Sequence, residues 1–119
     1  MAQSFEDLVV WQKAMELAGQ VYQLCREGLL AKDWGLRDQL QRAVVSIAAN
    51  IAEGYEREGR KEYLRFLQIA KGSAGELRCL LRPATRFGYL PDHCAPRVLA
   101  EAAGVSRMLK GLMASLQSD

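Results

Sequence analysis

GLRDQLQRAVVSIAANIAEGY, residues 35–55, is the stretch that decides the fold of this chain. Its apolar residues recur every three or four positions, which is the spacing of one face of an α-helix. They are Leu36, Leu40, Ala43, Val44, Ile47, Ile51 and Tyr55. The central run from Ala43 to Ala52 carries no charge, yet it is too short to cross a bilayer. The stretch therefore predicts a helix with a buried face over about residues 35–57.

Three further segments share this helical periodicity. We expect helices over about residues 5–27, 60–87 and 95–117, the first of them opening at Ser4 in the capping-like run SFED and stopping near Gly28. Pro83 removes one N–H from the third segment, so we expect a kink or an early end there. No run alternates with period two. The sequence therefore predicts an all-α fold, an antiparallel up-down-up-down four-helix bundle in a single domain over residues 1–119.

The second helix has more apolar surface than one core face requires. Val45, Ala48, Ala49 and Ala52 are predicted to lie opposite its core stripe. A helix that is apolar nearly all round is usually buried, and a small bundle cannot cover both faces of one helix. We therefore expect this second face to pack against another copy of the chain, giving a homo-oligomer. The alternative is that the alanines serve helix propensity alone.

Polar residues border the core faces of the second and third helices. They are Ser46, Asn50, Glu53, Ser73 and Glu76. Two facing carboxylates can act as an acid and a base, but no reactive third group accompanies them. A half-buried polar group needs partners, and such groups can fix the register between helices. We interpret the five residues as a structural polar cluster.

The sequence offers no catalytic, metal or cofactor site. The single histidine, His93, stands in a loop beside Cys94, without the spacing of a zinc site. Cys25 and Cys79 lie within predicted helices, and no third group is present to orient a Cys–His pair. We therefore expect no enzyme, no small-molecule substrate and no membrane segment. Three widely spaced cysteines and the absence of a signal peptide favour a reducing cytoplasm.

Basic residues concentrate in one part of an otherwise balanced chain. The region from Arg57 to Arg86 holds eight Lys or Arg against three Glu, a balance of +5, so the rest of this +2 chain is at −3. Five of them repeat at helical spacing and form a candidate nucleic-acid surface: Arg60, Lys71, Arg78, Arg82 and Arg86. Charged helix positions more commonly face solvent without a ligand.

Several segments resemble one bacterial family. FEDLVVWQKAMELA, GLRDQLQRAVVSIAANIAEGY, YLRFLQIAKGSAGEL, FGYL and SRMLKGLMASL are similar to the four-helix intervening-sequence proteins, whose founding members are encoded in insertions within large-subunit ribosomal RNA genes. A related branch assists the reverse transcriptase of diversity-generating retroelements. Two positions depart from the family pattern: Ala48 replaces its usual proline, and Pro83 interrupts a helix that members generally continue.

The resemblance implies a four-helix bundle that forms a homo-oligomer, a five-membered ring in known cases. It brings no catalytic residues, and it implies that the block containing the polar cluster and Gly54 is a structural signature. Two interpretations of function stay open. The first is an oligomer that binds structured RNA or a nucleoprotein partner through the basic residues of the third helix. The second is an oligomeric scaffold that binds protein and no nucleic acid.

Overall fold

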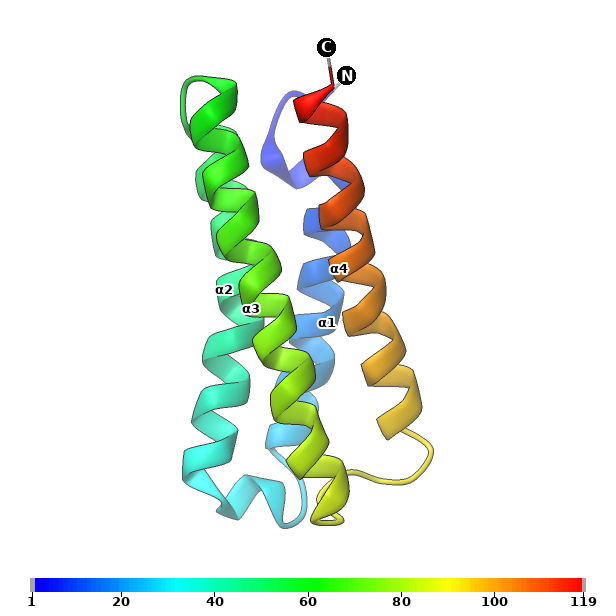
Figure 1. Ribbon diagram of the computed structural model, residues 1–119. Coiled ribbons are helices and arrows are strands. Elements are labelled where there is room, and N and C mark those ends of the chain that lie inside the picture. Colours follow the sequence, from blue (N-terminus) through cyan, green and yellow to red (C-terminus); the bar gives the residue numbers. More distant parts are fainter. Residues whose placement is uncertain (1, 119) are drawn as a thin grey trace.

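Four long helices lie side by side along a body that measures 47 × 20 × 20 Å (Figure 1). They are α1 (Val9–Cys25), α2 (Trp34–Glu56), α3 (Arg60–Arg86) and α4 (Ala95–Gln117). Short 3-10 turns, η1 (Phe5–Asp7) and η2 (Leu30–Lys32), precede α1 and α2. The structure, a computed structural model, describes residues 2–118, and no strand occurs within them. The predicted all-helical fold with four helices is confirmed.

The first helix begins later and ends earlier than predicted. The Ser4 hydroxyl accepts the N–H of Glu6 at 3.1 Å, so it caps the turn η1 and not α1. Leu8 then takes an extended conformation and packs its side chain on the core, which separates η1 from α1. The helix ends at Cys25, and Gly28 lies beyond its end with a φ of +58° that favours glycine.

Pro83 does not end the third helix, so of the two alternatives expected there, a kink or an early end, the early end is excluded. Figure 1 shows α3 as one ribbon that continues to Arg86. Beyond the proline, the N–H of Phe87 donates to the Pro83 carbonyl at 2.8 Å, and the Thr85 hydroxyl donates to the Leu81 carbonyl at 2.8 Å. Leu81 and Ala84 are buried on either side of Pro83, so core packing holds this last turn in place.

Each helix contributes one apolar face to a shared core, as the periodicity predicts. The most central of these positions are at most 2% exposed: Ala14, Leu17, Leu40, Ile47, Ile51, Leu67, Ala74, Leu77, Ala102, Val105 and Leu109. Within the described residues, no polar or charged residue is buried as a whole. No described helix combines the length and apolar character that a membrane span requires.

The helices α2 and α3 run in opposite directions and approach closely. Ser46 on α2 contacts Ser73 on α3, whereas Gly54, further along α2, packs on Tyr63 and Phe66, earlier on α3. A Cβ atom on Gly54 would lie 2.8 Å from the Phe66 Cβ. Glycine at this position therefore permits the two backbones to come this near.

Candidate nucleic-acid interface

The five basic residues predicted to bind nucleic acid all lie on α3 and are exposed. We call Arg60, Lys71, Arg78, Arg82 and Arg86 the basic stripe. Because α3 is unbroken from Arg60 to Arg86, one helix carries the whole stripe. The Arg60 guanidinium donates to the Leu116 carbonyl at 3.2 Å, which places the beginning of the stripe against the end of α4.

Four members of the stripe have no acidic partner among residues 2–118. Lys71, Arg78, Arg82 and Arg86 form no ion pair or hydrogen bond with other described side chains. Two other cations of this region behave differently, and Arg57 pairs with Glu53 at 3.0 Å. Arg65 pairs with Glu62 at 3.1 Å, and its hydrogen bond lowers the pKa of that carboxyl group. The four stripe cations therefore keep their donors available to an anionic ligand.

Three of the five predicted polar residues form a hydrogen-bonded cluster between α2 and α3. The hydroxyl groups of Ser46 and Ser73 lie 2.8 Å apart across the two helices. The Asn50 amide donates to the Ser46 carbonyl at 2.8 Å and to its hydroxyl at 3.0 Å. All three side chains are half-buried. We call these three residues the serine cluster, and it joins α2 to α3 in one register.

The two carboxylates of the predicted cluster do not take part in it. Glu53 instead pairs with Arg57 one turn along α2, at 3.0 Å. Glu76 is exposed and makes no hydrogen bond or ion pair with the described residues. The prediction that Glu53 and Glu76 belong to the cluster was wrong. At the edge of a core face, a long carboxylate side chain can reach water or a neighbouring arginine instead. Since the two carboxylates do not meet, they form no acid–base pair.

We expect Ser46→Ala to lower the free energy of unfolding by about 1–2 kcal/mol, because the substitution leaves the half-buried Ser73 hydroxyl without its partner and removes one acceptor of Asn50. Urea unfolding followed by circular dichroism measures the change. The matched control, Glu76→Gln, is expected to change stability by less than about 0.5 kcal/mol. An equal loss of unfolding free energy in both variants would contradict this assignment, because it would show that the Glu76 carboxylate takes part in the cluster.

The outer face of α2 is only partly as predicted. Val45 is 46% exposed, Ala49 is exposed and Ala52 is half-buried. Ala48 is 5% exposed and belongs to the core, so its placement opposite the core stripe is wrong. Successive residues are rotated by about 100° around the axis of a helix. This rotation places Ala48 on a flank of α2 that the bundle covers, and not on the outer face.

Sequence reasoning missed one member of this face. Ile69 on α3 is 41% exposed and lies one turn before Ser73, while Asn50 lies one turn after Ser46 on α2. Because α2 and α3 run in opposite directions, Ile69 and Asn50 stand at the same level. We therefore group the exposed residues Val45, Ala49 and Ile69 as a candidate apolar face over α2 and α3. The signal in the sequence was Ile69 itself, an isoleucine outside the predicted core stripe.

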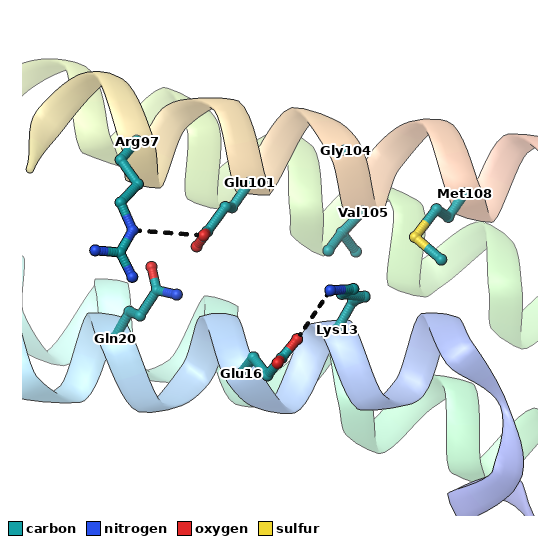
Figure 2. A pocket seen from close by; sticks show the side chains of 8 residues that line it. All are labelled: Lys13, Glu16, Gln20, Arg97, Glu101, Gly104, Val105 and Met108. Atoms are coloured by element: carbon teal, nitrogen blue, oxygen red, sulfur yellow. Dashed lines mark ion pairs between the residues drawn. The ribbon is translucent and has the colours of Figure 1, made fainter.

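A groove of about 380 Å³ separates α1 from α4 (Figure 2). Lys13 pairs with Glu16 at 3.4 Å on one wall, and Arg97 with Glu101 at 3.6 Å on the other. The side-chain amide oxygen of Gln20 is buried and has no hydrogen-bond partner among the described residues. Since each wall neutralises its own charges, the groove has no surplus charge to attract an ionic substrate. The sequence did not predict it.

The cysteines and the histidine show no catalytic arrangement among residues 2–118. Cys25 is buried, and burial raises the pKa of its thiol to about 11 against the opposing effect of Arg37. A protonated thiol is a poor nucleophile. Cys79 is exposed on α3, and Cys94 is half-buried beside the exposed His93. Among the described residues, no group of three His, Cys, Asp or Glu is placed to hold a metal ion.

These features define the class: a small all-helical protein of four helices, with an exposed basic stripe along one of them. Over residues 6–111 the chain matches the 23S rRNA-intervening sequence proteins, and it belongs to that family. This confirms the predicted membership. A crystal structure of a protein with unknown function from the S23 ribosomal protein family of Bacteroides thetaiotaomicron is similar, with a TM-score of 0.80 and 23% identity. The similarity covers 88% of this chain and 98% of that one, and it shows a shared fold. No curated protein sequence matches.

Proposed function

We propose that this chain is a non-enzymatic bundle protein that binds structured RNA through the basic stripe. One observation carries the proposal: Lys71, Arg78, Arg82 and Arg86 are exposed on one continuous helix and have no acidic partner among the described residues. Exposed cations without an acidic partner gain the most binding free energy from phosphate groups, because binding releases the counterions condensed on RNA. A net charge of +2 makes the local concentration of charge on α3 more important than the total.

The proposal includes an assembly. We expect an antiparallel up-down-up-down bundle that forms a homo-oligomer, with five subunits by family resemblance. Val45 on α2 and Ile69 on α3 are exposed, and Ala49 lies on α2 between the levels of these two residues. These residues support a contact between copies of the chain. Repetition of the stripe around a ring would multiply its charge. Three free thiols also fit a cytoplasmic, reducing compartment.

The test is binding of a blunt RNA hairpin across a salt series. We expect wild-type affinity to fall steeply with salt, because each phosphate contact contributes about −0.9 to the slope of log K against log salt. Substitution of Lys71, Arg78 and Arg82 together by alanine is expected to lower affinity on the order of 100-fold at 0.1 M salt. The slope of the variant should be shallower by about 2–3.

A second triple variant controls for net charge. Lys13, Arg65 and Arg97 are each paired with a glutamate, so their joint substitution by alanine removes the same charge without touching the stripe. This variant is expected to keep nearly wild-type affinity. If both triples weaken binding equally, general charge and not the stripe binds RNA. If wild type does not bind at low salt, RNA binding is refuted, and the apolar face of α2 and α3 then favours a protein scaffold.

A further inference from the structure

The α1–α2 and α3–α4 connections lie at the same end of the body (Figure 1), and large exposed hydrophobic residues occur in or beside both connections. Trp34 begins α2 and is 70% exposed, while Phe87 follows α3 and is 60% exposed. Leu29, in the α1–α2 connection, is exposed as well. Tryptophan is enriched at interaction surfaces, because burial of its large ring against a partner removes much apolar area from water.

A bridge of contacts holds Tyr89 and Phe87 at the start of α2. Asp33 caps α2 by accepting the N–H of Leu36 at one oxygen, and it accepts the Tyr89 hydroxyl at the other, at 3.1 Å each. The Tyr89 ring in turn packs edge-on against the Phe87 ring, with 5.7 Å between their centres. Because Asp33 directly precedes Trp34, its hydrogen bond to Tyr89 joins the start of α2 to the segment that follows α3, and we define Trp34, Phe87 and Tyr89 as the aromatic end.

One cation lies beside the Trp34 ring, and two others precede Phe87 along α3. The Arg37 guanidinium stands 5.8 Å from the centre of the Trp34 ring and is held by its hydrogen bond to the Ala31 carbonyl at 2.9 Å. Arg82 and Arg86, the last two members of the basic stripe, lead along α3 to Phe87. Asp33, the acid nearest to Trp34 in sequence, already accepts a hydrogen bond at both oxygens. Phe87 of the aromatic end therefore directly follows Arg86, a stripe cation that has no acidic partner among the described residues.

We infer that the aromatic end stacks the unpaired bases of a single-stranded RNA segment that adjoins the structured RNA on the basic stripe. Aromatic rings beside a track of cations are the combination that single-stranded nucleic acid requires: the cations follow the phosphates and the rings take the bases. The continuity of the stripe with Phe87 favours RNA over a protein partner at this surface. The inference rests on the proposed function, and it adds the kind of RNA that is recognised.

The test compares two RNA hairpins, one blunt and one with a single-stranded tail of about ten nucleotides, which lies within the range that single-strand-binding modules cover. For wild type, the tail is expected to raise affinity about 5- to 150-fold, the range for one stacked base. Trp34→Ala should bind the tailed hairpin no better than the blunt one, while its affinity for the blunt hairpin stays at the wild-type level. Val9→Ala, which alters an apolar residue that is 57% exposed at the start of α1, should keep the gain.

A fluorescence measurement reports stacking directly. The chain has two tryptophans, so Trp11→Phe leaves Trp34 as the single tryptophan emitter. We expect the tailed hairpin to quench this emission and the blunt hairpin to leave it unchanged. If wild type binds both hairpins equally, the inference is overturned while the proposed function stands. If neither hairpin binds, both are overturned. If Trp34→Ala instead lowers the particle mass in solution, the inference is also overturned, because the surface then belongs to a contact between copies of the chain.

Discussion

Gly54→Ala is expected to lower the free energy of unfolding by about 1–3 kcal/mol, although alanine is the better helix former by about 1 kcal/mol. The added Cβ would lie 2.8 Å from the Phe66 Cβ and 3.2 Å from the Tyr63 carbonyl oxygen. Both atoms belong to or adjoin the backbone of α3, so neither can turn aside as a flexible side chain would. Gly54→Val brings two further carbons into the same space and should cost still more, with loss of cooperative unfolding as the extreme result.

Two other glycines provide the matched control. Gly72 and Gly75 lie within α3 and are exposed, and a Cβ added at either position would have no neighbouring side chain or other helix within 4 Å. Alanine at either place is expected to raise the free energy of unfolding by about 0.5–1 kcal/mol through helix propensity alone. Denaturant unfolding of the three alanine variants should therefore give opposite signs. Should Gly54→Ala stabilise the protein as the controls do, the close approach of α2 and α3 would be wrong.

The helical periodicity was enough to predict the core, because burial of a whole face is an average over many residues. Ala14, Ile47 and Leu67 are each buried as their spacing indicates. A residue on the flank of a helix is harder to assign, since its burial depends on where the neighbouring helix lies. For this reason Ala48 was placed outside although it is buried, and Ile69 went unnoticed although it is 41% exposed.

Spacing in the sequence also predicts side-chain contacts only in part at the candidate sites. Spacing predicted that Ser46, Asn50 and Ser73 would meet, because short polar side chains can bond only to what stands next to them. The prediction from spacing failed for Glu53 and Glu76, because their longer side chains can reach several partners or water. The bridge from Asp33 to Tyr89 joins residues 56 positions apart, so no local pattern indicates it. The aromatic end therefore became visible only in three dimensions.

Ala49→Arg is expected to reduce the particle mass of an oligomeric wild type to that of one subunit, 13.3 kDa. Ala49 is exposed within the apolar face formed with Val45 and Ile69. If this face packs against another copy, the substituted guanidinium would be buried without an acid, which costs several kcal/mol at each contact. Light scattering coupled to size-exclusion chromatography measures the mass.

The control is Ala100→Arg, the same substitution at an exposed alanine of α4, which should leave the mass of the assembly unchanged. The effect of Ala49→Arg is expected to be all-or-none, because a ring built from head-to-tail contacts repeats the same pair of patches at every interface. One substitution per chain then weakens every contact at once. An unchanged mass for Ala49→Arg would move the interface away from α2. A wild type that is itself monomeric would refute the assembly, and the basic stripe of α3 would then have to bind RNA without repetition.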